Sequence, residues 1–248
     1  MSWQQRLVRA RILGVLGVLA TILLLTIPAP AVATAAVEAP PDLPAIVLNE
    51  VAGYKIAPPG IGLSGQIGNG QMAGSPDASL ARAQLFDAAA ANYARTFVTA
   101  QGRTAVIVGL DMGTVGAARS FEAGARDSSP QTGAVAPIPG LDNAFRVAIR
   151  PDKLPAGASA EQVFLQSGRL VFILGISDRV TSPVTDGDAT DLAWLQAAAV
   201  PAEISSQKAE PGGASSVGYA AGEAVGVMLL AGLVVVAVVT VRRRRAVR

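Results

Sequence analysis

Two segments of the chain repeat one pattern, and this repeat constrains the fold more than any other feature. Residues 102–110 read GRTAVIVGL and residues 168–176 read GRLVFILGI, so that a Gly-Arg pair, a central Ile and a later Gly coincide at an offset of 66 residues. A Gly-Arg pair favours a hairpin turn, because Gly tolerates positive φ. A strand-like apolar run precedes each copy, at 93–100 (YARTFVTA) and 162–166 (QVFLQ). The pattern predicts two β-hairpins.

Each expected hairpin is followed by an alanine-rich segment with helical spacing, Val115–Arg126 in the first unit and Asp188–Ala199 in the second. Strands that are apolar almost throughout are typical of sheet centres covered by helices. The expected core residues are Phe97, Val106, Val108 and Phe121 in the first unit, and Phe172, Leu174, Leu192 and Leu195 in the second. One more strand is expected at Asn143–Arg150, and a loop at 127–141. The repeat has two explanations, an ancient duplication or the recurrence of a common hairpin pattern.

The C-terminal part of the chain is apolar and ends in a basic cluster. Residues 217–241 read VGYAAGEAVGVMLLAGLVVVAVVTV, and no charge occurs from Ala224 to Val241. About 20 apolar residues in a helix suffice to cross a bilayer. Four arginines follow at once: Arg242, Arg243, Arg244 and Arg245. Because such clusters are retained in the cytoplasm, the pattern predicts one transmembrane helix with a basic cytoplasmic tail at 242–248.

The first 36 residues have the order of a secretory signal peptide. A cationic start precedes an uncharged run from Ile12 to Ile27, and Ala-x-Ala cleavage sequences follow it. An uncleaved N-terminal span is the alternative. In both cases the middle of the chain lies outside, as a linker (37–44), an extracytoplasmic domain (45–201) and a stalk (202–216). The expected location is the cell membrane, with a single pass, the bulk of the chain extracytoplasmic and the C-terminus cytoplasmic.

The expected fold class combines these elements. It is α+β: an antiparallel sheet from two β-hairpin–helix units with helices on one face, plus one C-terminal transmembrane helix. The charge distribution excludes nucleic acid as an expected partner. Residues 37–216 hold 12 of the 20 Lys and Arg residues and 17 of the 18 Asp and Glu residues, so this part is negative by about five charges. A DNA-binding domain carries its excess of cations on the folded part.

The residue inventory limits catalysis and metal binding. The chain has no His and no Cys, which removes Ser-His-Asp and Cys-His mechanisms and the common zinc sites. Asp186–Asp191 resembles part of a calcium loop, but the twelfth position of that loop would be Ala197, and a helix cap by Asp188 explains these residues better. No cofactor, metal or catalytic residue is expected, and the chain is expected not to be an enzyme.

Gly218, Gly222 and Gly226 form two overlapping G-x-x-x-G steps in the expected membrane helix. Small residues four positions apart let two helix backbones approach closely. The glycines therefore predict helix–helix association, with a membrane or envelope protein or with a second copy of the chain. The lipid bilayer is the other expected partner.

Several short segments carry a resemblance. They are Gly53-Tyr54, Arg95-Thr96-Phe97 with the following Gly102-Arg103, Pro139-Gly140-Leu141 with Asn143-Ala144, and Leu195-Gln196 before Pro201. Together with an excess of Arg over Lys, they make the chain resemble exported single-pass membrane proteins of actinobacteria that have an α+β extracytoplasmic domain. The resemblance covers most of residues 50–201, implies no particular activity and transfers no functional residue.

These features predict a membrane-anchored extracytoplasmic binding or interaction module, either an accessory subunit of an envelope complex or the outer part of a sensor. One alternative is an envelope hydrolase that acts through paired carboxylates. The other is a carrier of a small apolar ligand, which would need an apolar pocket between the sheet and its helices.

Overall fold

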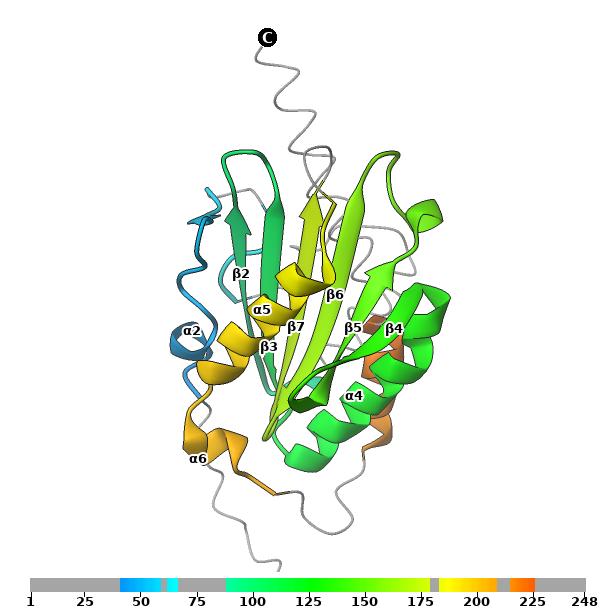
Figure 1. The fold of residues 1–248 in the computed structure, drawn as a ribbon. Coiled ribbons are helices and arrows are strands. Elements are labelled where there is room, and N and C mark those ends of the chain that lie inside the picture. Colours follow the sequence, from blue (N-terminus) through cyan, green and yellow to red (C-terminus); the bar gives the residue numbers. More distant parts are fainter. Residues whose placement is uncertain (1–40, 59–61, 67–87, 179–182, 209–214, 226–248) are drawn as a thin grey trace, which may run out of the picture. The chain divides into compact units, whose positions relative to one another are not determined.

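The computed structural model describes residues 41–58, 62–66, 88–178, 183–208 and 215–225, all within the compact unit Pro40–Arg248. A seven-stranded antiparallel sheet runs through it in the order β1-β2-β3-β7-β6-β5-β4 (Figure 1). The strands are β1 (Lys55–Ile56), β2 (Ala91–Val98), β3 (Thr104–Asp111), β4 (Gly133–Ile138), β5 (Leu141–Ile149), β6 (Ser159–Ser167) and β7 (Leu170–Asp178). The helices are α2 (Leu43–Ile46), α4 (Val115–Ser128), α5 (Asp186–Ala198) and α6 (Ala202–Ser205), with the 3-10 turns η1 (Ser129–Gln131) and η2 (Pro151–Lys153). Residues 216–225 form a further helix.

The two hairpins expected from the repeat are present. Strand β2 pairs with β3, and β6 pairs with β7, along their full lengths. Gly102 and Gly168 have φ values of +96° and +57°, so both Gly-Arg pairs lie in turns that use the left-handed region. The strand expected at 143–150 is β5. The expected loop at 127–141 is wrong, because this segment contains the edge strand β4. Pro137 is tolerated there, since an edge strand does not need the N–H that proline lacks to bond a second neighbouring strand.

The two copies of the repeat form neighbouring strands, β3 and β7, at the centre of the sheet. Val106 pairs with Gly175 in the sheet, whereas the repeat matches Val106 with Phe172. Gly175 and Phe172 are three residues apart on β7. Because side chains along a strand alternate between the two faces of the sheet, an odd separation places Val106 and its repeat equivalent Phe172 on opposite faces. Val106 indeed lies in the core on one face and Phe172 in the core on the other. The repeat therefore does not produce two equivalent units.

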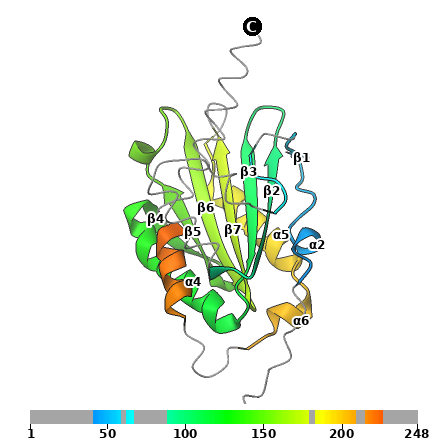
Figure 2. The ribbon, with the colours of Figure 1, turned by 180° about the vertical axis from the view of Figure 1, so that it is seen from behind.

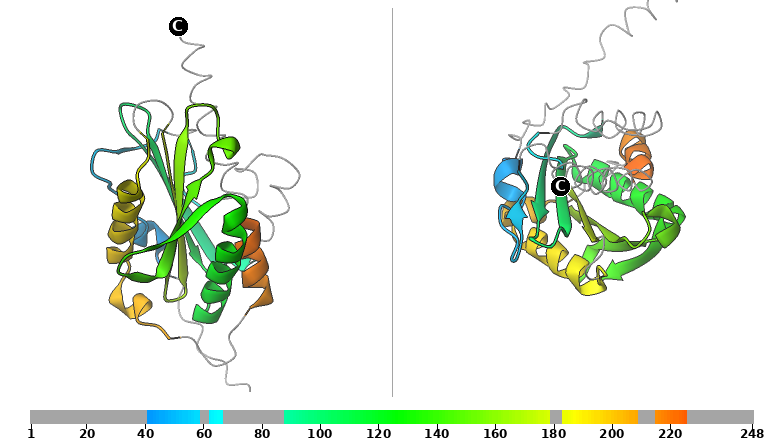
Figure 3. Two further views of the ribbon diagram at one scale, coloured as in Figure 1. Left: turned by 45° about the vertical axis from the view of Figure 1, so that its right-hand side comes forward. Right: turned by 90° about the horizontal axis from the view of Figure 1, so that it is seen from above.

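Helices cover both faces of the sheet, which corrects the expectation of helices on one face (Figure 1 and Figure 3). Helix α4 packs on one face through Phe121 and its neighbours, and α5 and α2 pack on the other through Leu192 and its neighbours. Phe97 is buried as expected, but it lies in the core on the α5 side and not with Phe121. Leu195 was expected in the core and is 48% exposed, so that prediction is wrong. All eight residues of β3 are buried, because the strand is covered on both faces.

The expected transmembrane helix at 217–241 is also corrected. Within the described ranges, no helix is long and apolar enough to cross a bilayer. The helix at 216–225 lies along α4 (Figure 1 and Figure 2) and contributes Ala221 and Val225 to the core on that face. Small residues on its inner side permit this close packing.

Gly218 and Gly222 form the contact between this helix and α4. A Cβ atom on Gly218 would lie 2.7 Å from the carbonyl oxygen of Ala117, and one on Gly222 would clash with that of Phe121. The glycines thus pair two helices of the same chain, while their expected association with a second chain stays a prediction. Gly226 and the expected topology residues Arg242, Arg243, Arg244 and Arg245 lie outside the described residues.

Candidate functional site

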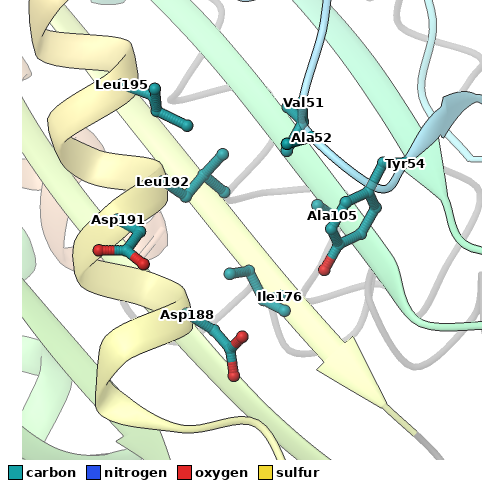
Figure 4. Close-up of a pocket in the computed structure, with 9 residues that line it drawn as sticks. All are labelled: Val51, Ala52, Tyr54, Ala105, Ile176, Asp188, Asp191, Leu192 and Leu195. Carbon is teal, nitrogen blue, oxygen red and sulfur yellow. The ribbon is translucent and has the colours of Figure 1, made fainter.

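A pocket of about 230 Å³ opens between α5 and the segment that precedes β1 (Figure 4). Its lining residues are Val51, Ala52, Tyr54, Ala105, Ile176, Asp188, Asp191, Leu192 and Leu195. Ala105 of β3 and Ile176 of β7 are cross-strand partners and lie between the two walls. Ala52 and Ala105 contribute only a methyl group each, so their short side chains leave the space open. The pocket is apolar with carboxylates on one wall.

Buried hydrogen bonds hold the two walls of the pocket in place. The side chain of Gln196 on α5 is buried, with its Nε2 donating to the carbonyl oxygen of Ile46 at 3.0 Å and its Oε1 accepting from the N–H of Leu48 at 3.1 Å. From β2, the Arg95 guanidinium donates to the carbonyl oxygens of Val47 and Leu48, both at 2.6 Å. Because buried polar groups are costly to leave unpaired, these bonds fix the N-terminal segment against the sheet and α5.

A cluster of charged groups centred on Arg103 adjoins the pocket through two of its lining residues, Asp188 and Tyr54. Arg103 Nε lies 3.2 Å from Asp178 Oδ2, and Arg103 Nη1 lies 2.8 Å from Asp188 Oδ1. Burial raises the pKa of the Tyr54 hydroxyl, although a hydrogen bond with Arg103 acts to lower it. Tyr54 therefore stays protonated and presents a neutral hydroxyl group to the pocket.

Asp188 is held as an anion by its donors. Burial acts to raise its pKa, but hydrogen bonds from the backbone N–H and the hydroxyl of Thr185, at 2.8 and 2.9 Å, and the charge of Arg103 together lower the pKa. Thr185 is the N-cap of α5, and Asp188 completes a capping box. The helix begins at Asp186, so the cap expected at Asp188 is in fact three residues earlier. Two of the three carboxylates of the calcium-like sequence, those of Asp186 and Asp188, are paired with guanidinium groups.

Asp191 differs from Asp188, although both line the pocket. Its side chain is exposed, and among the described residues it forms no hydrogen bond or ion pair. Asp191 is one helical turn beyond Asp188 on the same side of α5. Its carboxylate is therefore accessible to a group that enters the pocket.

A second polar cluster lies under the first turn of α5. Arg146 of β5 pairs with Glu161 of β6 at 3.1 Å and also with Asp186. Glu161 is only 4% exposed, and its Oε2 has no hydrogen-bond partner. Burial raises the pKa of Glu161 to about 7; Arg146 acts to lower this pKa, while Asp186 and Asp188 act to raise it. The carboxyl of Glu161 therefore titrates near neutral pH, and it does not line the pocket.

The glycines singled out in the sequence, Gly218 and Gly222, lie on the α4 side of the sheet and do not contribute to the pocket. The sequence did not indicate this pocket. It assigned Leu192 and Leu195 to the core and Asp188 to a helix cap, and Tyr54 occurs in a segment that carries the actinobacterial resemblance. An available signal was the Trp194-Leu195 pair, two large apolar residues together on a short helix. Comparison with known proteins gives no assignment: no family model matches the chain, and no curated protein or solved structure shows significant similarity to it.

Proposed function

We propose that this chain is a binding module whose pocket beside α5 receives one apolar side chain of a partner protein. The observation that carries the proposal is the exposure of a large apolar side chain at the pocket. Leu195 lines the pocket and is 48% exposed. Exposed apolar groups around a cavity are typical of a contact surface, where one buried anchor supplies much of the binding energy.

The size of the pocket favours a side chain over a free small ligand. Pockets for drug-sized ligands usually measure about 300–1,000 Å³. The volume of about 230 Å³ is below this range and suits a single leucine- or phenylalanine-sized group. The pocket therefore supports an interaction module better than a carrier of a small apolar ligand.

The positions of the carboxylates favour binding over hydrolysis. Glu161 is the group with the raised pKa that a general acid needs, but it is buried, bonded to Arg146 and outside the pocket. Asp188 is engaged by Arg103. A pair of reachable carboxylates on either side of a substrate, as glycoside hydrolysis requires, would have to be built from other groups.

The partner that we propose is extracytoplasmic, such as another subunit of an envelope complex. The support is the sequence of residues 1–36, which has the order of an export signal.

A selection from random peptides displayed on phage, with the full chain as the target, tests the proposal. We expect the selected peptides to share an apolar residue whose replacement by alanine removes binding. Leu195→Asp should lower the affinity of the chain for these peptides by about tenfold or more, because the new carboxylate would have to lose its hydrating water when a peptide binds. The matched control is Ile56→Asp, since Ile56 is similarly exposed, at 53%, and does not line the pocket.

Equal weakening by Leu195→Asp and Ile56→Asp would place the contact elsewhere and refute the proposal. Selected peptides that bind both variants as tightly as the native chain would refute it as well.

A further inference from the structure

The charges around the N-terminal half of α5 do not balance. Arg103 forms ion pairs with two acidic residues, Asp178 and Asp188. Arg146 forms ion pairs with two more, Glu161 and Asp186. Asp191 adds a fifth carboxylate. In the part of the chain that the structure describes, two guanidinium groups thus face five acidic groups. Lys55 is next to Tyr54 in sequence, but it does not line the pocket.

The pKa of Glu161 agrees with this imbalance. Burial is the largest cause of its rise, and the nearby carboxylates of Asp186 and Asp188 raise the pKa further, against the lowering effect of Arg146. Excess negative charge acts on a neighbouring carboxyl in this direction. The potential at the open side of the pocket is therefore negative, and a positive group would be attracted there.

The geometry assigns this charge to recognition. Building on the function proposed above, we propose that the partner segment carries a lysine or arginine next to its apolar anchor, and that the cation pairs with Asp191. Leu192 and Leu195 contact the apolar side chain, and Asp191 lies on the same face of α5, at the pocket. Asp188 cannot take this role, because its carboxylate is already held by Arg103 and Thr185. The occupant is an apolar–basic segment of a protein.

Three short synthetic peptides test the inference. Each is blocked at both ends and has the same leucine anchor, followed by lysine, by uncharged norleucine or by glutamate. We expect the lysine peptide to bind the full chain about two- to fivefold more tightly than the norleucine peptide, the range of exposed ion pairs, and the glutamate peptide to bind more weakly than both. Asp191→Asn should remove the advantage of lysine and leave the norleucine peptide unchanged. Calorimetry or amide shifts in NMR give the affinities.

Salt and a control variant complete the experiment. Added sodium chloride should reduce the preference for lysine, because exposed charges are screened. Asp142→Asn removes a carboxylate from β5 that does not line the pocket, and it should preserve the preference.

The possible failures of the two proposals differ. If the three peptides bind with equal affinity and none of them binds Leu195→Asp, the basic residue in the partner is refuted, while the proposed binding of an apolar side chain in the pocket is supported. Binding that is insensitive to Leu195→Asp would refute both. A preference for lysine that persists in Asp191→Asn would refute the role of Asp191.

Discussion

At the scale of single residues, Glu161 on β6 links the stability of the fold to pH. Its carboxyl would titrate at about 4.5 in the unfolded chain, whereas burial raises the pKa to about 7 in the folded protein. Between these values the folded state binds a proton that the unfolded state has already lost. The stabilisation is therefore complete below about pH 4.5 and decreases as the pH rises through 7.

We expect Glu161→Gln to remove this pH dependence. The amide has the shape of the protonated carboxyl, and its Oε1 can still accept from Arg146, so the variant should gain on the order of 2 kcal/mol over the native chain between pH 4.5 and pH 8. Urea unfolding at several pH values measures the free energy of unfolding. The control is Glu203→Gln, which removes an exposed carboxylate from α6. Parallel pH profiles of the native chain and Glu161→Gln would show that the prediction is wrong.

At the scale of secondary structure elements, the pairing of the helix at 216–225 with α4 depends on the absence of side chains. A Cβ on Gly222 would meet the carbonyl oxygen of Phe121, and one on Gly124 of α4 would meet that of Tyr219. The Tyr219 hydroxyl donates to Asp127 at 2.6 Å, which adds a polar contact at the surface. Backbone contact of this kind leaves no room for a larger residue on either helix.

Gly222→Leu should therefore separate the helix at 216–225 from α4. Leucine favours a helix more than glycine does, by about 1 kcal/mol, but the steric conflict and the loss of buried area outweigh this gain, and we expect a net loss of about 1–3 kcal/mol in the free energy of unfolding. Thermal unfolding measures the change. Val217→Leu is the matched control, because Val217 is on the same helix and is 54% exposed. A variant as stable as the control would contradict the packing described here.

At the scale of the whole molecule, the protection of backbone amides from hydrogen exchange should decrease from the centre of the sheet to its edges. Strands β3 and β7 pair with each other, lie between two cores and are buried along nearly their whole length. The edge strand β1 has two residues, both exposed, and β4 is partly exposed. Residues with few buried contacts open locally without global unfolding.

Native-state hydrogen exchange tests this order. We expect the amides of β3 and β7 to exchange only with the free energy of global unfolding, and those of β1 and β4 to exchange with a lower free energy. Measuring exchange at increasing denaturant concentrations below the unfolding transition distinguishes local from global opening. Amides of β4 as protected as those of β3 would contradict the expected order.

The sequence by itself determined the local elements. Gly-Arg turns between apolar runs specify the hairpins β2–β3 and β6–β7, since Gly102 and Gly168 supply the positive φ that those turns need. Alanine-rich segments with helical spacing specify α4 and α5. These features depend on residues that are close in the chain, and so they can be recognised from the order of residues alone.

Only the tertiary structure decided which face each helix covers, what the helix at 216–225 contacts, and where the pocket lies. The pairing register of β3 with β7 places Val106 and Phe172 on opposite faces, and a shift of one residue would reverse this. The pocket unites the segment before β1, two central strands and α5, which are brought together by Gln196 and by Arg95. Register and packing depend on contacts between distant parts of the chain, and for that reason neither is encoded in any one segment.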